Sequence, residues 1–205
     1  FLYCGAACFL PVQQPYTVNI EPVRRWTLGK SKRTFPQPDT LLFRLLSLTA
    51  ISGEFPASQL NRLPAGPCYL EAAVTTLKKE GLLRTYYRDR LRGYRLGVRA
   101  KSALLSGWPE RFAPYLTGNV DTNHLKSETS RRLRLHHLAE AYVTVDNAGI
   151  RLFPDEKPEV FAPQGYCGNA IESPSFYSSR EIKGLGIDTT KIYNSRFSGV
   201  ILSPT

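Results

Sequence analysis

Prolines and glycines divide residues 38–107 into short segments, and this punctuation limits the fold more than any other feature of the chain. The first segment follows Pro36-Gln-Pro-Asp39, and Gly53 and Pro64-Ala-Gly-Pro67 mark the later boundaries. In the first segment leucines recur one, three and four residues apart, at positions 41, 42, 45, 46 and 48. This is the period of a helix with one face toward a core. We therefore expect a helix here that ends at Gly53, followed by further short helices.

Two more helices are expected after the first, whose N-cap is Asp39 or Thr40. The second is short, at about 56–63, and the third spans about 67–80. Pro67 suits the first helical position, where a backbone N–H would have no partner, and Gly81 suits the C-cap. The period of the third helix predicts a buried face of Leu70, Ala73, Val74 and Leu77 and an outward face of Tyr69, Ala72, Thr75, Thr76 and Lys79.

A hairpin is expected next. Leu82–Tyr87 is a β-prone run rich in aromatic residues, and Tyr94-Arg-Leu96 pairs back with it as a second short strand. We expect Arg88–Gly93 between them to form a charged loop, and another helix to begin near Val98. The predicted order is therefore helix, helix, turn, helix, hairpin, helix.

That order, with the residues that close the third helix, resembles the winged helix-turn-helix. Leu77-Lys-Lys-Glu-Gly-Leu-Leu83 followed by Tyr94-Arg-Leu96 is similar to the LxxxGLL…YxLTxxG signature of winged-helix regulators, with Gly97 where the family often has Thr. The resemblance implies a DNA-binding domain over 38–107. Its third helix would enter the major groove, and its hairpin would touch the DNA backbone or the minor groove.

The charge pattern agrees with a polyanionic partner. The chain has 27 Lys and Arg against 17 Asp and Glu, a net charge of +10. Between Arg84 and Lys101 the chain has seven basic residues and one acid, Asp89. The positive charges repel one another, and a polyanion bound beside the hairpin would relieve this repulsion. The predicted DNA contacts are Tyr69, Thr75, Thr76 and Lys79 on the helix and Arg84, Arg88, Arg90, Arg92 and Arg95 on the hairpin. The alternative is a winged helix that contacts a protein partner.

The flanking regions are less constrained. Residues 1–37 read as a basic arm that is either a phosphate-contacting extension or a solvated tail. After Gly118 we expect a long helix that ends at about Val145, with Asp121 or Thr122 as its N-cap. Its basic residues form either a solvated face or a second DNA contact; they are Arg131, Arg132 and Arg134. Short β-type runs follow, at about 150–153, 160–162 and 197–202. We expect a second domain over 119–205, incomplete because it ends on an unpaired strand.

A nuclease is the enzymatic alternative. Pro154-Asp155 and Glu181-Ile-Lys183 match the sequence motif of metal-dependent PD-(D/E)xK nucleases. In these enzymes two carboxylates hold a divalent ion and the Lys orients the attacking water. In this chain Glu140 would be an outer ligand of the ion. Ser178-Ser-Arg-Glu181, however, has the spacing of a helix capping box. We expect the chain not to cut DNA by itself.

Other chemistry has little support in the sequence. The four cysteines are scattered and are expected to be reduced thiols in a cytoplasmic protein, and the histidines lack zinc-binding spacing. No Gly-rich phosphate loop or dinucleotide fingerprint is present, and no stretch reaches the roughly 18 apolar residues of a membrane span. We expect no cofactor, no metal and no membrane partner.

Further motifs resemble the replication-relaxation proteins of Gram-positive conjugative elements and plasmids. They are Tyr115-Leu-Thr-Gly118, Phe176–Lys183 and Lys191–Arg196, which follow the winged-helix pattern. The resemblance implies a role in mobile-element replication or transfer, and a C-terminal region distantly related to restriction-type nucleases. We therefore predict a cytoplasmic α+β protein that binds double-stranded DNA, sequence-selectively or structure-selectively, in replication, transfer or regulation of such an element. The choice between monomer and homodimer stays open.

Overall fold

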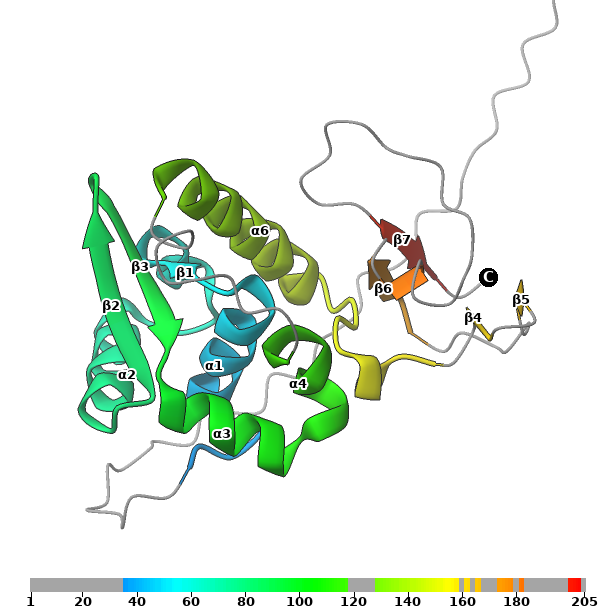
Figure 1. Cartoon of the computed structure of the whole chain (residues 1–205), viewed down its shortest axis with the longest axis horizontal. Helices are drawn as coiled ribbons and strands as arrows, with labels where there is room; N and C mark the ends of the chain where they lie inside the picture. Colours follow the sequence, from blue (N-terminus) through cyan, green and yellow to red (C-terminus); the bar gives the residue numbers. More distant parts are fainter. Residues whose placement is uncertain are drawn as a thin grey trace, which may run out of the picture. The chain divides into compact units, whose positions relative to one another are not determined.

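The computed structural model describes residues 35–117, 128–158, 161–162, 165–166, 173–178, 181–182 and 199–203 (Figure 1). Helices and small antiparallel sheets are mixed in this part of the chain, so the α+β class is confirmed. The described residues from Phe35 onward belong to one compact unit. The basic arm expected over 1–37 lies, up to residue 34, outside the described residues. Within the described ranges no helix is both long and apolar enough to cross a membrane.

The central helix is α1, Leu41–Ser52, and its ends follow the sequence. The Thr40 hydroxyl accepts a hydrogen bond from the Phe43 N–H at 3.3 Å, which confirms Thr40 as the N-cap. Gly53 ends the helix with φ of 78°, a left-handed conformation that glycine adopts at little cost. Most of α1 from Phe43 onward is buried, so the rest of the fold packs around it.

Three elements lie between α1 and the hairpin: β1 (Phe55–Pro56), the 3-10 helix η1 (Ala57–Arg62) and α2 (Pro67–Lys79). The predicted buried face of α2, made of Leu70, Ala73, Val74 and Leu77, is confirmed. Its outward face is also as predicted, with Thr76 half-buried and the other members exposed. The apolar period alone therefore determines how α2 sits on the core.

The hairpin consists of β2 (Leu83–Arg88) and β3 (Leu91–Leu96), and β1 pairs with the other edge of β3. The prediction of a charged loop over Arg88–Gly93 is wrong, because both strands extend further than predicted. Only Asp89 and Arg90 form the turn, with φ of 53° and 61°. Two left-handed residues are typical of the type I′ turn, whose twist matches that of paired strands.

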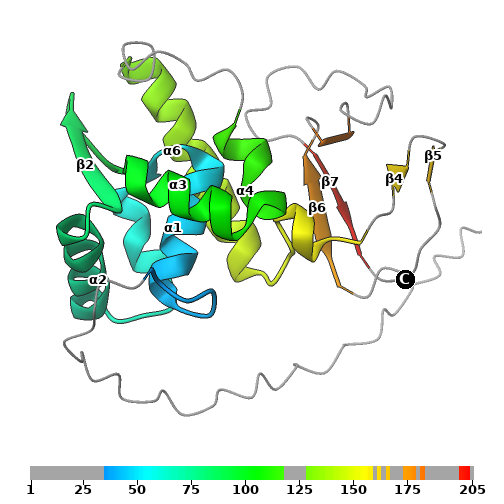
Figure 2. The same cartoon turned by 60° about the horizontal axis from the view of Figure 1, so that its bottom comes forward.

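The next helices are α3 (Val98–Gly107), α4 (Pro109–Leu116) and α6 (Thr129–Asn147). Pro109 is the first residue of α4. Helix α4 packs on both α3 and α1 (Figure 2), and α6 packs along α1 (Figure 1). The expected caps Asp121 and Thr122 lie outside the described residues.

The second domain expected from residue 119 is not separate in the described residues. Ala139, Tyr142 and Val143 of α6 belong to the same hydrophobic core as Phe43 of α1. Aromatic rings extend this core from Phe43 to Phe112 of α4, at 6.1 Å between centroids, and on to Phe153, at 5.9 Å. The chain after the winged-helix pattern therefore completes the core of the part before it.

The remaining described elements are short: the 3-10 helix η2 (Pro154–Glu156), β4 (Phe161–Ala162), β5 (Gly165–Tyr166), β6 (Ser175–Ser178) and β7 (Gly199–Leu202). The strand expected over 150–153 is reduced to one bridge, between Arg151 and Ser175. The expectation of an unpaired final strand is wrong, since β7 pairs antiparallel with β6.

Candidate nucleic-acid interface

Helix α2 presents the side chains that the sequence singled out. Tyr69 is 40% exposed, Thr75 and Lys79 are exposed, and Thr76 is half-buried. Lys78 and Lys79 both lie in the last turn of the helix. The outer face of α2 therefore combines short hydroxyl side chains, one aromatic ring and positive charge, which are groups that contact base edges and phosphates.

The pleat of the hairpin separates its side chains into two faces. The register places Tyr87 opposite Arg92 and Thr85 opposite Tyr94, on the face whose base is anchored in the core by Leu83. Near the tip this face is open: Tyr87 is 68% exposed, and Thr85 and Arg92 are exposed. The first face therefore ends in an aromatic ring beside an arginine.

The second face carries Arg84, Tyr86 and Arg88 on β2, opposite Arg95, Gly93 and Leu91 on β3. Arg84 and Arg88 are exposed, as is Arg90 in the turn. The hairpin thus exposes Arg84, Arg88, Arg90 and Arg92, with one acid, Asp89, among them. These four arginines project from both faces and from the tip rather than from a single face.

Arg95, the fifth arginine predicted to contact DNA, has a different partner. Its side chain is 19% exposed and pairs with Glu54 at 2.7 Å. Its guanidinium also lies 4.2 Å from the centroid of the Tyr86 ring. Since a carboxylate already neutralises Arg95, we remove it from the set of phosphate contacts.

Glu54 is the centre of an ion cluster that the sequence did not indicate. Its side chain is fully buried and bonds Arg132 Nη2 at 2.7 Å, His136 Nε2 at 2.8 Å and Arg95 Nε at 2.7 Å. Burial on its own raises the pKa of Glu54, but the hydrogen bonds from His136, Arg132 and Arg95 outweigh it and lower the pKa to about 2. Glu54 is therefore a carboxylate at neutral pH.

Arg132 connects this cluster to the hairpin. Its guanidinium donates to the backbone carbonyls of Arg88, at 2.9 Å, and Leu91, at 3.0 Å, and more weakly to that of Tyr86, at 3.3 Å. A guanidinium has five N–H donors, and here they are shared between one carboxylate and three carbonyls. Both predictions for Arg132, a solvated face and a second DNA contact, are wrong because the side chain has no exposed surface.

A spacing signal for Arg132 was available in the sequence. Arg132 and His136 are four residues apart, and Ala139 and Val143 continue the same helical stripe. All except His136 are buried, and the His136 side chain is only 12% exposed. A basic residue in line with a buried stripe indicates a buried ion pair, whereas Leu133, outside the stripe, is 40% exposed.

The carboxylates of the nuclease alternative each have their own basic partner. Asp155 pairs with Arg111 at 3.1 Å, and Glu181 pairs with Lys157 at 2.5 Å. Glu181 also accepts hydrogen bonds from the backbone N–H and hydroxyl of Ser178 while its own N–H donates to that hydroxyl, so the capping box is confirmed. Lys183 lies outside the described residues. The described residues hold no group of three His, Cys, Asp or Glu suited to a metal ion.

Lys157 is nearly enclosed, with 3% of its side chain exposed. Burial lowers its pKa, and the Glu181 carboxylate acts in the opposite direction. Burial also raises the pKa of Tyr142, to about 12, with Glu181 adding to the effect. Lys157 and Glu181 therefore form an ion pair in which Lys157 is nearly enclosed and Glu181 is 26% exposed.

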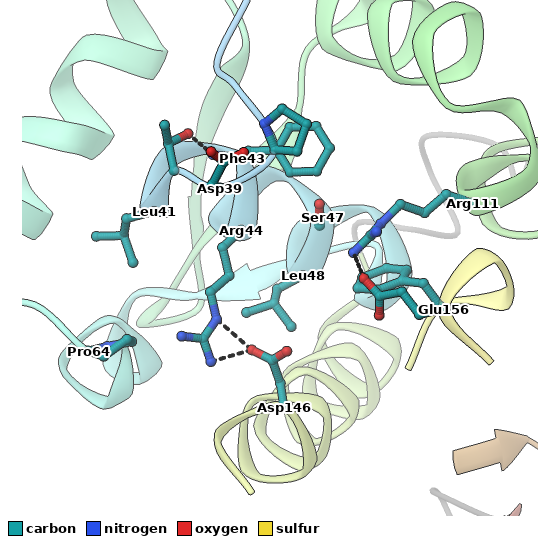
Figure 3. A pocket seen from close by; sticks show the side chains of 13 residues that line it. Asp39, Leu41, Phe43, Arg44, Ser47, Leu48, Pro64, Arg111, Asp146 and Glu156 are labelled. Atoms are coloured by element: carbon teal, nitrogen blue, oxygen red, sulfur yellow. Dashed lines mark hydrogen bonds and ion pairs between the residues drawn. The ribbon is translucent and has the colours of Figure 1, made fainter. Parts of the chain in front are cut away.

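A hollow of about 410 Å³ lies where α1, α4 and α6 meet (Figure 3). Two ion pairs line it: Arg44 with Asp146, and Arg111 with Glu156. Two atoms of lining residues, Ser47 Oγ and Arg111 Nε, are buried and have no hydrogen-bond partner in the described part of the chain. None of the predicted DNA contacts lines this hollow.

The comparisons with known proteins add no relative. The chain matches no family model, no curated protein and no solved structure.

Proposed function

We propose that residues 38–107 are a winged helix-turn-helix module and that the protein binds double-stranded DNA through α2 and the β2–β3 hairpin. The element order supports the proposal, because three helical segments precede a tight hairpin and a further helix follows it. The sheet order β1-β3-β2 supports it too, since the segment after α1 adds a third strand to the hairpin. Helix α2 would be the recognition helix and the hairpin the wing.

The observation that carries the proposal is the exposed charge of the wing. Arg84, Arg88, Arg90 and Arg92 are exposed within nine residues of chain, and Asp89 is the single acid among them. Arg95, on the same strands, is neutralised by Glu54, which shows that the fold supplies a carboxylate where an arginine must be buried. Among the described residues none of the other four pairs with a buried carboxylate, and Arg88 pairs only with the exposed Asp89, at 3.6 Å. Phosphate groups are the partners that suit them.

The two elements would contribute different kinds of contact. In the major groove, the hydroxyls of Thr75 and Thr76 on α2 would reach base edges, and Lys79 would reach a phosphate. The wing arginines would contact phosphates next to that groove, which sets the position of α2 but carries no sequence information. Selectivity would therefore come from α2 or from the shape of the duplex, and most of the affinity from the wing.

The biological setting implied by the replication-relaxation resemblance belongs to the same proposal. In this proposal the protein acts in the cytoplasm of a bacterium, in the replication, transfer or regulation of a mobile element. The chemistry of the interface is compatible with any of these three roles, because each needs a protein that finds and holds a duplex.

A binding assay with matched competitors tests the proposal. The protein is titrated into a labelled 30-base-pair duplex in the presence of the unlabelled duplex, a single strand of the same length or heparin. We expect the duplex to compete better than the single strand at equal phosphate concentration. A forked duplex and duplexes from mobile-element origins then separate structure selectivity from sequence selectivity. Failure to bind any duplex at low salt would instead favour a protein partner for the wing.

A further inference from the structure

The turn at the tip of the wing is built from unusual residues. Type I′ turns favour Asn-Gly or Asp-Gly because both central residues need a positive φ, which glycine adopts without cost. Here the second position is Arg90, at φ of 61°, and it is exposed. A side chain in this conformation persists only where the surroundings fix it, and such positions cluster at functional sites. The turn thus places a guanidinium at the apex at some conformational cost.

The first turn of α6 supplies the groups that fix this tip. Arg132 donates to the carbonyls of Arg88 and Leu91, the two residues that flank the turn. The Thr129 hydroxyl donates to the carboxylate of Asp89, the first turn residue. The backbone on both sides of Arg90 is therefore held by one helical turn, which begins about 40 residues later in the chain.

The core in turn fixes Arg132. Glu54 binds it at 2.7 Å, and the same carboxylate lies against Gly93 of the wing, where an added Cβ would be 2.2 Å from Glu54 Oε1. The Tyr86 ring covers the guanidinium, with Cζ 4.6 Å from its centroid. Movement of the wing tip would therefore break a buried ion pair and several hydrogen bonds at once.

We propose that Thr129 and Arg132 form a clamp that positions the wing tip, so that Arg90 meets DNA in one fixed orientation. This inference rests on the proposed DNA binding and deepens it, because it makes α6 a part of the binding unit without contact with the nucleic acid. Arg132 is a positioning residue: its effect on DNA passes through Arg90. A pre-ordered tip loses less conformational entropy when it binds than a mobile one.

The experiment measures log affinity against log salt concentration for the full chain and its variants. A neutralised phosphate contributes about 0.9 to this slope, so Arg90→Ala should flatten it by about that amount. Arg132→Lys keeps the charge but loses the planar fork that reaches several acceptors. We expect Arg132→Lys to flatten the slope at least as much as Arg90→Ala, and the double variant to flatten it no further than Arg132→Lys alone. Arg62→Lys, at an exposed arginine that pairs with Glu140 and is not a proposed DNA contact, is the matched control and should leave the slope unchanged.

Two further measurements keep the clamp testable. Thr129→Val removes only the hydroxyl that holds Asp89, so it should lower the affinity for DNA by a smaller factor than Arg132→Lys does. This variant still tests the clamp if Arg132→Lys fails to fold. Amide hydrogen exchange at residues 88–91 should accelerate at least tenfold in either variant, with exchange in α2 unchanged. Independent effects of Arg90→Ala and Arg132→Lys on the slope, or unchanged exchange at the tip, would overturn the clamp. A wild-type chain that fails to bind DNA would overturn the proposed function instead, and the exchange data would still decide whether the tip is clamped.

Discussion

Glu54 and Arg132, 78 residues apart in the chain, form an ion pair of 2.7 Å in which neither side chain has any exposed surface. The pair joins the segment after α1 to the first turn of α6, and the backbone of the wing accepts the remaining donors of Arg132. Buried charges cost free energy on transfer from water, so an unpaired member of such a cluster is strongly unfavourable. The stability of the fold and the position of the wing therefore depend on the same contact.

Removal of one partner of this pair should destabilise the protein severely. Arg132→Met leaves the Glu54 carboxylate buried with a reduced set of donors, and we expect the free energy of unfolding to fall by about 3–5 kcal/mol. Urea denaturation measures this change. Arg134→Met, the same substitution at an exposed position of α6, is the control and should change stability by less than about 0.5 kcal/mol.

The double variant Glu54→Leu/Arg132→Met should be less destabilised than Arg132→Met alone. Replacing both charges removes the carboxylate that had lost part of its donors, although Arg95, His136 and the wing carbonyls still lose a partner. A double variant whose loss equals the sum of the two single losses would show that the two residues act independently, contrary to the structure.

The same carboxylate predicts how stability changes with pH. Glu54 titrates at about 2 in the folded protein, below its ordinary value of 4.5. Its contribution to the free energy of unfolding is therefore complete above about pH 4.5 and disappears as the pH falls toward 2. The two values differ by the equivalent of about 3 kcal/mol. Urea denaturation at several pH values should show this loss in the wild type, and Glu54→Gln should lack that component. Parallel curves for the two proteins would contradict the assignment.

Gly93 should tolerate no side chain. A Cβ at this position would be 2.2 Å from Glu54 Oε1, and Glu54 is held by three basic side chains and cannot retreat. We expect Gly93→Ala to lower the free energy of unfolding by about 1–3 kcal/mol, as overpacking does. Gly107→Ala provides the comparison, since nothing lies within 4 Å of an added Cβ there. Equal thermal stability of the two variants would show that Glu54 does not cover Gly93.

The elements that the sequence predicted well are those with local causes. Thr40 caps α1 and the apolar period orients α2 because both depend on residues a few positions apart. The burial of Arg132 was not predicted, although its place on the apolar stripe of α6 was a signal, and its partner Glu54 is brought to it only by the packing of α6 on α1. The two-residue turn was missed because Asp89-Arg90 lacks the glycine that normally marks it.

The separate second domain was expected for a related reason. Short β-type runs begin near residue 150 and suggest a new domain, and no local pattern shows that Tyr142 and Phe153 complete a core begun by Phe43. Likewise, the charge of the wing was visible in the sequence, but which arginine is neutralised was not. Arg95 and Arg84 are neighbours across the strands, and the tertiary position of Glu54 gives Arg95 its buried partner.

We expect the chain not to cleave DNA. Asp155 is paired with Arg111 and Glu181 with Lys157, whereas a metal-dependent nuclease needs carboxylates that converge on one cation. Supercoiled plasmid incubated with the protein and Mg²⁺ or Mn²⁺ should stay supercoiled. Nicking that disappears in Asp155→Ala and Glu181→Ala, with the folded state intact by circular dichroism, would establish the enzyme in place of this expectation.

The salt dependence of duplex binding tests the central claim most directly. Log affinity is measured against log salt concentration for the wild type, for Arg88→Ala/Arg90→Ala/Arg92→Ala and for the control Arg62→Ala, an exposed arginine that already pairs with Glu140, on one duplex. Each phosphate contact contributes about 0.9 to the slope, so the triple variant should flatten it by about two to three, and the control should not change it. An unchanged slope in the triple variant, or a wild-type affinity that does not depend on salt, would contradict DNA binding through the wing.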